Sequence, residues 1–221
     1  MNVLVLSDNS VLERAKPIFQ KRRINRWTFT DSDSINPKKD FKHIFDNYDL
    51  IFSLHCKKIF PKVLTDSVRC INIHPGFNPF NRGVYPHVFS IIDGLPAGAT
   101  IHEMDSGIDT GPIIIQQQVQ VEPNDTSTTL YKRVIDAEMN ILDIMLDRIL
   151  DNDYKKSYPL IEDRQYNSMK DFKNLCRINP IQSGSFAEFY DLLRALSHVG
   201  YMNASMNGIK FKLIIDNGKT D

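Results

Sequence analysis

Short apolar runs alternate with longer amphipathic stretches over the first 150 residues of the chain. Four runs are brief and rich in β-branched or aromatic residues, which is typical of buried strands. These runs are 3–7, 26–31, 49–55 and 70–74, and two further runs, 97–104 and 111–121, also predict strands. The stretches between them, 8–22, 40–48 and 84–94, predict helices. A long amphipathic helix is predicted over 127–152, where apolar residues recur at helical spacing and Thr126 or Ser127 could cap the start.

The alternation of strands and helices predicts the fold class. It favours a Rossmann-like α/β domain over residues 1–152, with a mostly parallel sheet and flanking helices. In sheets of this kind, ligands bind at the carboxyl ends of the strands. We therefore expect the chemistry at the end of the strand 70–74.

The pattern changes after residue 152. A polar connection is followed by a helix predicted over 185–198, where Ser185 and Glu188 have capping-box spacing. Two short strands are predicted around the Asn-Gly pair within 201–216. We interpret residues 153–221 as a small helix and hairpin subdomain. A unit of this size could hardly bury a core alone, so we expect it to pack on the first domain or on a second copy.

Composition excludes several classes of protein. Lys plus Arg and Asp plus Glu balance at 27 each, so nothing favours binding to nucleic acid or to an anionic membrane. The three cysteines are odd in number and match no zinc spacing, which fits a protein of the reducing cytoplasm. The N-terminal apolar run is too short for a signal peptide, and no run approaches the ~20 residues of a membrane helix.

The stretch "INIHPGFNPFNRG", residues 71–83, carries the first candidate chemistry. Asn72 and His74 are two residues apart in a strand, so their side chains project from the same face, and Pro75 ends the strand. An amide can donate to a developing oxyanion, and an imidazole can donate or move a proton near pH 7. The pair suits the transfer of a carbonyl-type group to a nucleophile. The alternative is that both residues only form the turn.

The loop "HEMDSGIDTGP", residues 102–112, carries the second group of candidate catalytic residues. It contains Asp105 and Asp109 and more acid than a plain turn needs, although an ordinary Asx turn is the alternative. An Asp beside His74 would orient the ring and raise its pKa. We therefore predict an Asn72–His74–Asp109 set. No dinucleotide glycine motif, Walker sequence, G-x-S-x-G or H-E-x-x-H is present, and no metal site is expected.

Two stretches resemble the folate-dependent formyltransferases. They are "INIHPGFNPFNRGVYP" and "GATIHEMDSGIDTGPII", and the N-terminal strand agrees with them. The sequences of these two stretches, together with "LLRALSHVGYMNA" at 192–204, are similar to those of the sugar nucleotide N-formyltransferases. The proline that usually follows the R-A-L stretch is absent, which leaves the loop geometry there open. The C-terminal part is too short for the barrel domain of methionyl-tRNA formyltransferases, so tRNA is not expected as a substrate.

The resemblance implies a formyltransferase fold and a reaction. A formyl group would pass from 10-formyltetrahydrofolate to the amine of a nucleotide-linked amino-dideoxysugar, with dTDP-4-amino-4,6-dideoxyglucose favoured and O-antigen or a similar glycan as the destination. Asn72 would donate to the oxyanion, and His74 would donate too or relay a proton. Asp109 would hold His74 and help to pass the amine proton onward. Other acceptors stay open: a dTDP-3-amino or GDP-4-amino sugar, or glycinamide ribonucleotide. A catalytically silent ligand-binding domain is a further alternative.

Binding residues follow from the same resemblance. The folate is expected beside the loop 105–111 and the end of the strand 49–55, with Ser53, Leu54, His55 and Asp105 as candidates. The candidates on the nucleotide side are Asn9, Asn78, Asn81 and Arg82. A guanidinium matches phosphate geometry, which makes Arg82 the best diphosphate candidate, although it could pair with a local carboxylate instead. For Ser53 and His55 the alternative is plain strand packing.

A homodimer is the expected assembly. Alternating apolar residues at 209, 211, 213 and 215 give the C-terminal hairpin one apolar face. The predicted helix 185–198 can cover only part of it, and an exposed remainder marks an interface. Similar sugar formyltransferases dimerise through this end. The alternative is packing of the hairpin against the long helix of its own chain.

Overall fold

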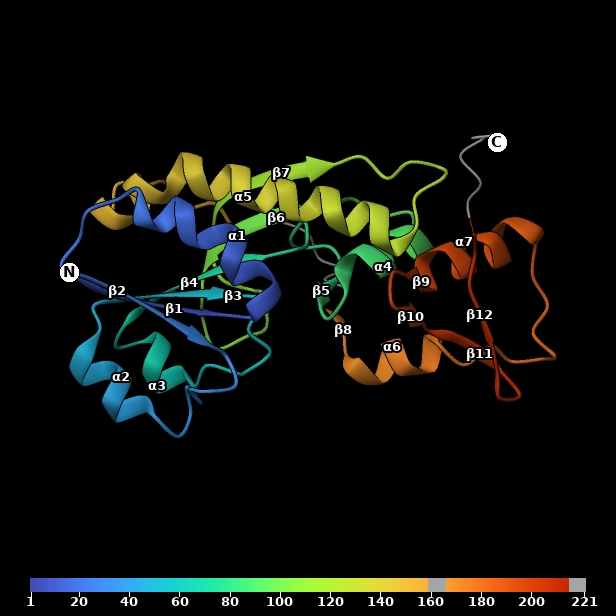
Figure 1. Ribbon diagram of the computed structural model, residues 1–221, viewed down its shortest axis with the longest axis horizontal. Helices are drawn as coiled ribbons and strands as arrows, with labels where there is room; N and C mark the ends of the chain where they lie inside the picture. The colour runs from blue at the N-terminus through green and yellow to red at the C-terminus, as the bar shows by residue number, and fades with distance from the viewer. Residues whose placement is uncertain (159–165, 215–221) are drawn as a thin grey trace.

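A six-stranded sheet forms the centre of the protein in the computed structural model, which describes residues 1–158 and 166–214 (Figure 1). The strands are β1 (Asn2–Ser7), β2 (Arg26–Asp31), β3 (Leu50–Leu54), β4 (Arg69–His74), β6 (Ala97–Glu103) and β7 (Ile113–Val119). Their order is β2-β1-β3-β4-β6-β7. The first four are parallel, and β6 and β7 join antiparallel. This confirms the predicted α/β class with a mostly parallel sheet.

Helices cover both faces of this sheet. They are α1 (Asn9–Gln20) and α5 (Ser127–Asp151) on one face, with α2 (Phe41–Asn47) and α3 (Lys62–Thr65) on the other (Figure 1). Strand β1 shows the consequence: Val3 and Val5 belong to the core on the α1/α5 side, and Leu4 and Leu6 to the core on the α2/α3 side. Because both faces are buried, the strand is apolar throughout rather than alternating.

The carboxyl ends of the parallel strands lie at one edge. The register pairs Ser7 with Leu54, and Leu54 with Ile73. His74 is the last residue of β4 at this edge, and α1 begins two residues after β1. The fold therefore gathers the polar residues that follow three buried strands.

The turn after β4 is closed by a distant part of the chain. Strand β5 (Arg82–Gly83) pairs in parallel with β8 (Tyr166–Asn167), and Val84 N donates to the Asn167 carbonyl at 3.0 Å. Gly83 has φ 96°, and a Cβ there would clash with the Asn167 carbonyl oxygen, so only glycine fits. Helix α4 (Pro86–Asp93) follows. The sequence did not predict the pairing of β5 with β8.

Short elements make up the C-terminal part. They are α6 (Met169–Leu175), α7 (Phe186–Leu196), β9 (Ser197–His198), β10 (Tyr201–Met202), β11 (Ala204–Met206) and β12 (Ile209–Phe211). The capping box of α7 is confirmed: Glu188 N donates to Ser185 Oγ at 3.2 Å and Ser185 N donates to Glu188 Oε2 at 2.6 Å. The hairpin of β11 and β12 around Asn207–Gly208 is confirmed as well, whereas residue 215 of its predicted apolar face lies outside the described residues. Helix α6 was not predicted.

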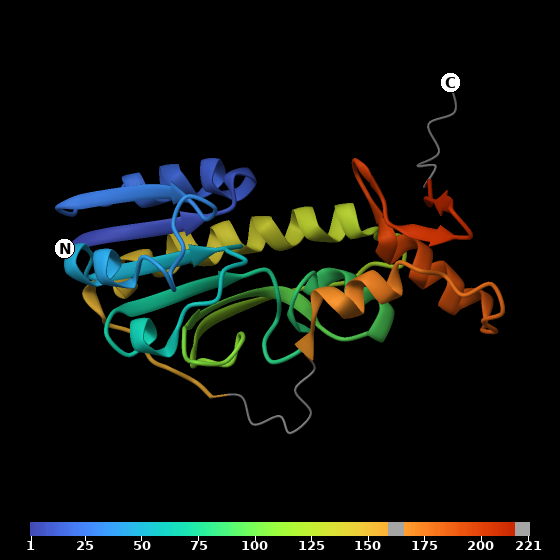
Figure 2. The same ribbon diagram turned by 90° about the horizontal axis from the view of Figure 1, so that it is seen from below.

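The C-terminal elements pack on the first 150 residues. Leu192, Ala195, Leu196 and Ala204 are buried in the same cluster as α1, α5 and one face of the sheet. Figure 2 shows α5 running from the sheet to these elements, where Ser127 Oγ lies 3.0 Å from His198 Nδ1. The N-cap of α5 is Thr126 rather than Ser127. The division into domains 1–152 and 153–221 stays a prediction.

Charged residues occupy the outer side of α5. Asp136 pairs with Arg14 at 2.6 Å, and Asp143 and Asp147 pair with Arg22 at 2.7 and 3.0 Å. These contacts tie α5 to α1. Across residues 1–158 and 166–214, none of the helices combines the length and apolar character needed to cross a lipid bilayer.

Candidate active site

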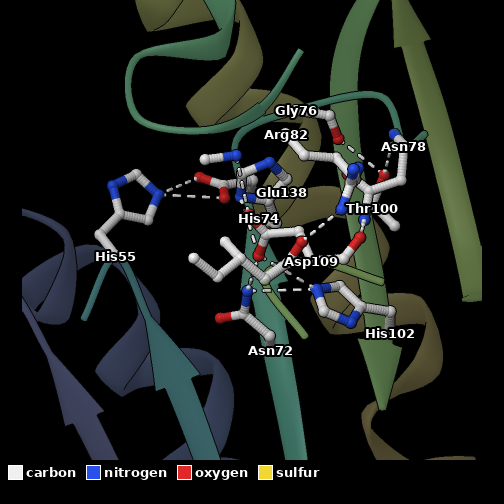
Figure 3. Close-up of polar contacts among 12 residues, drawn as sticks. His55, Asn72, His74, Gly76, Asn78, Arg82, Thr100, His102, Asp109 and Glu138 are labelled. Atoms are coloured by element: carbon white, nitrogen blue, oxygen red, sulfur yellow. Dashed lines mark hydrogen bonds and ion pairs between the residues drawn. The ribbon is translucent and has the colours of Figure 1, made fainter. Parts of the chain in front are cut away.

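Asn72 and His74 project together at the end of β4, as their spacing predicted (Figure 3). His74 is buried, with 5% of its surface exposed, whereas Asn72 is half-buried. The sheet register sets Asn72 between Ser53 of β3 and His102 of β6. Each of these neighbours therefore comes to Asn72 from a different strand.

Asp109 reaches the pair from the loop between β6 and β7. Asn72 Nδ2 donates to its Oδ1 at 3.1 Å, and Gly83 N donates to its Oδ2 at 3.0 Å. The same Oδ1 lies 3.7 Å from His74 Nδ1. The three residues of the predicted set are therefore brought together, and the turn at Gly83 helps to hold the carboxylate.

His102 is a fourth member that the sequence did not identify. Its Nδ1 lies 2.7 Å from the Glu103 carbonyl oxygen, and its Nε2 lies 3.2 Å from Asn72 Nδ2 (Figure 3). A carbonyl can only accept, so the proton resides on Nδ1 and Nε2 accepts from Asn72. Asn72 thus donates to both His102 and Asp109, which fixes the plane of its amide.

Burial controls the charge of His74. It lowers the pKa of His74 to about 4, although the nearby Asp109 carboxylate favours the charged form. Asp109 acts in the predicted direction, since its carboxylate raises this pKa, but desolvation of the buried ring is the larger effect and the net pKa is lowered. The imidazole is therefore neutral at neutral pH.

The surroundings of Asp109, unlike those of His74, favour the charged form of the side chain. Burial alone would raise the pKa of Asp109, but the two neighbouring imidazole rings and the hydrogen bond from Gly83 N hold it well below its usual range. The site therefore combines an ionised carboxylate with a neutral imidazole. Such a pair can take up a proton at the ring without first losing one.

One buried atom of the site faces no polar group of the protein. Among the described residues, His74 Nε2 has no hydrogen-bond partner, although it is shielded from solvent. Gly76 makes room at this atom, because a Cβ at position 76 would clash with Nε2. Buried polar atoms are nearly always paired, so an unpaired one beside an ionised carboxylate is a candidate for contact with a reactant.

The residues predicted to bind the folate lie near this centre. Ser53 and Leu54 are buried at the end of β3, and His55 follows with its ring 2.8 Å from Glu138 Oε2. Asp105 is exposed in the loop of Asp109, where its Oδ1 accepts from Gly107 N at 2.9 Å and from a threonine hydroxyl. Their binding roles stay predictions.

Three of the four residues predicted to bind the nucleotide are buried. Asn9 begins α1, but its side chain lies outside the described part of the structure. Asn78, Asn81 and Arg82 are buried: Asn78 Nδ2 donates to the Asp109 carbonyl at 3.0 Å, and Arg82 Nη1 donates to the Ile108 carbonyl at 2.8 Å. Asn81 bonds to a serine of α4 and accepts from an asparagine of β8.

These contacts give the turn a structural role that we did not predict. Asn78 and Arg82 each bind a backbone carbonyl of the Asp109 loop, and Asn81 ties the turn to α4 and β8. The three side chains brace the site rather than face outward. Their direct contact with a nucleotide stays a prediction that the geometry does not favour.

Two family models match the chain. One described as Formyl transferase matches residues 11–146, more than half of the chain. A second, described as N-formyltransferase dimerization C-terminal domain, matches residues 171–212. The first contains all four residues of the site, and the second contains α7 and the hairpin.

Individual proteins are similar over most of the chain. A dTDP-4-amino-4,6-dideoxyglucose formyltransferase of Mycobacterium bovis is 46% identical over 161 residues, which cover 73% of this chain and 68% of the relative. The structure of a 4-N formyltransferase from Francisella tularensis superposes with a TM-score of 0.89 at 36% identity, covering 97% of this chain and 98% of the other. The formyltransferase PseJ from Anoxybacillus kamchatkensis, solved with UDP-4,6-dideoxy-4-formamido-L-AltNAc and tetrahydrofolate, has a TM-score of 0.65 at 26% identity, covering 79% and 89%.

Proposed function

The chain belongs to the formyl transferase family, and we propose that it moves a formyl group from 10-formyltetrahydrofolate to the amine of a nucleotide-linked 4-amino-dideoxysugar. The favoured acceptor is dTDP-4-amino-4,6-dideoxyglucose, because the relative at 46% identity carries that substrate in its name. The observation that carries the proposal is the meeting of Asn72, His74 and Asp109 beside an unpaired buried ring nitrogen.

The site fits a bound folate. When bound, the folate supplies a formyl group carried on nitrogen. We assign its binding to the end of β3, at Ser53, Leu54 and His55, together with Asp105 in the facing loop. Apolar strand residues can hold the faces of a pterin while backbone groups pair with its polar edge. The solved relative that contains tetrahydrofolate supports this donor.

Asp109, His74 and Asn72 then act on the reacting groups. The ionised Asp109 favours the His74 tautomer with its proton on Nδ1, which leaves a lone pair on Nε2. Nε2 can then accept a proton from the attacking amine and return it to the folate nitrogen whose bond to the formyl carbon breaks. Asn72 Nδ2 can donate to an oxygen on which negative charge develops. Aligned proton transfer of this kind contributes roughly 10²–10⁴ in rate.

The direct test is an assay of the purified protein with 10-formyltetrahydrofolate and a panel of amines. The panel contains dTDP-4-amino-4,6-dideoxyglucose, its 3-amino counterpart, a GDP-4-amino sugar and glycinamide ribonucleotide. We expect mass spectrometry to show the gain of one carbonyl group on the dTDP-4-amino sugar. The proposal is overturned if no nucleotide-linked amino sugar is formylated, or if glycinamide ribonucleotide is the better acceptor.

We also propose that the protein works as a homodimer through its C-terminal hairpin. Val199, Tyr201 and Ile209 are each more than 60% exposed on these elements, which is unusual for large apolar side chains grouped in one small region. The match to a dimerization domain over residues 171–212 supports an interface here. Phe211, by contrast, packs partly against the core of its own chain.

Ile209→Asp is expected to convert the dimer to a monomer at micromolar concentration while the chain stays folded, as judged by an unchanged circular dichroism spectrum. The reason is that a carboxylate would be desolvated at the interface but not in the monomer. Light scattering coupled to size exclusion measures the change. Ile144→Asp, at an equally exposed position on α5, is the control and should stay dimeric. A wild-type monomer, or a dimer that is unaffected by Ile209→Asp, contradicts this interface.

A further inference from the structure

A fully buried carboxylate lies in the middle of α5. Glu138 has no exposed surface, and its two oxygens lie 3.0 and 2.8 Å from His55 Nε2 (Figure 3). A carboxylate is rarely buried unless it is paired. This pair connects the central part of α5 to the residue that follows β3, on the side of the site assigned to the folate.

His55 is also held through its other nitrogen. Its Nδ1 lies 3.1 Å from the Tyr131 hydroxyl, and Tyr131 precedes Glu138 by two helical turns on the same side of α5. A phenol can donate or accept a hydrogen bond. Both ring nitrogens of His55 therefore have a partner.

The backbone of His55 is strained. Its φ is 54°, in the left-handed region that residues other than glycine rarely adopt. Such conformations are costly and persist only where surrounding contacts hold them. Here the holding contacts come from Glu138 and Tyr131, and the strained turn is the point where the chain leaves the sheet edge.

His55 lies level with the reactive ring. Leu54 and Ile73 are paired in the register of β3 and β4, so His55 and His74 are the next residues on two neighbouring strands. Any displacement of His55 would move the start of the segment 55–61 relative to His74. A donor bound along this segment would be displaced with it.

We propose that Glu138 and Tyr131 are positioning residues for the formyl donor, which act through His55 and fix the start of the segment 55–61. The identity of the donor rests on the proposed function, whereas the contacts do not. Stability alone is a weak reason for such a pair, because replacing buried polar partners by apolar residues of the same shape can be nearly neutral or stabilising. Instead, these contacts hold the start of the segment 55–61 in a fixed position for binding of the donor.

The test measures binding of 5-formyltetrahydrofolate, which is not turned over, by calorimetry on the full-length protein. Glu138→Gln keeps the shape of the side chain but replaces one of the two oxygens near His55 Nε2 by an amide NH2, and we expect the dissociation constant to rise about tenfold. Tyr131→Phe removes one neutral hydrogen bond and should raise it about threefold. In turnover, KM for the folate should rise in both variants while KM for the amino sugar stays within about twofold, because only one substrate uses this edge.

Asp136→Asn is the matched control. It lies on the same helix, is exposed and pairs with Arg14, so its removal should leave the dissociation constant within about twofold. Circular dichroism and thermal melting identify any variant that fails to fold. If Glu138→Gln is lost in this way, Tyr131→Phe carries the test.

A double variant separates positioning from a general structural effect. If Glu138 acts through His55, then Glu138→Gln combined with His55→Gln should bind the folate no more weakly than His55→Gln alone. Fully additive losses, or unchanged folate binding in Glu138→Gln and Tyr131→Phe, overturn the inference. A wild-type protein that binds no 5-formyltetrahydrofolate overturns it too. Folate binding without formylation of any amino sugar contradicts only the proposed function.

Discussion

Asp109→Asn is expected to lower kcat about 10³-fold with little change in KM for either substrate. The carboxylate accepts from Asn72 Nδ2 through Oδ1 and from Gly83 N through Oδ2. A carboxamide has a single acceptor oxygen, so its NH2 would face one of these two donors. The negative charge beside His74 Nδ1 is lost at the same time, and with it the preference for a lone pair on Nε2.

Steady-state kinetics with varied folate and varied amino sugar measure this effect. Asp66→Asn serves as the control, because Asp66 is exposed and pairs with Lys62 one helical turn away. Its kcat should be unchanged, since exposed pairs of this kind contribute little. If Asp109→Asn keeps more than about a tenth of the wild-type kcat, Asp109 does not have the role assigned to it.

Acidification from pH 6 to pH 4.5 is expected to lower the free energy of unfolding, by about 2 kcal/mol for each pH unit. Two buried histidines contribute most of this loss, and Glu138, whose pKa is raised by burial, acts in the opposite direction. Burial lowers the pKa of His74 to about 4 and that of His87 to about 3. His87 lies on α4, where it faces Ser127 and Tyr131 of α5 and His198 of the C-terminal part.

The direction of this pH dependence follows from the histidine pKa values in the folded and the unfolded protein. Each folded pKa lies below the unfolded value of about 6.5, so the unfolded chain binds the proton first as the pH falls. The stability contributed by each neutral ring is therefore fully present above pH 6.5 and decreases down to its folded pKa. Each histidine contributes about 1.4 kcal/mol per pH unit within that window.

Urea unfolding followed by the fluorescence of Trp27, at several pH values, measures the slope. The variant His87→Gln removes one of the two titrating rings and should reduce the slope by about 1.4 kcal/mol per pH unit, whatever its stability at pH 7. His43→Gln is the control, because His43 is exposed on α2, and its slope should match the wild type. A flat profile in the wild type, or an unchanged slope in His87→Gln, contradicts the prediction.

The sheet and the core of the site could be predicted from the sequence because both depend on short-range patterns. Brief apolar runs marked the strands, and the two-residue spacing of Asn72 and His74 placed both side chains on one face. Helices α3 and α6 escaped prediction because they are only four and seven residues long, too short for a helical period to stand out. Local pattern thus identified the long elements and missed some short ones, although Leu64 of α3 is fully buried.

The remainder of the site depends on registers that no local pattern encodes. His102 meets Asn72 only because β6 runs antiparallel to β4 with those two residues opposite each other. Glu138 reaches His55 across 83 residues of chain. Arg82 carries a charge that favours the surface, yet it is buried because the Ile108 carbonyl accepts from it. Long-range partners of this kind require the folded coordinates.

The pairing of β5 with β8 also sets an order of events during synthesis of the chain. The turn that presents Gly83 N–H to Asp109 is bonded to Asn167, whose amide meets Asn81 from 86 residues further along. A ribosome adds roughly 5–20 residues each second, so this part of the chain emerges roughly 4–17 s after the turn. Until then the nascent protein holds Asn72 and His74 in the sheet but has no partner strand for the turn that steadies Asp109. The polypeptide would therefore gain its catalytic competence late, after the segment that returns to the turn has left the exit tunnel.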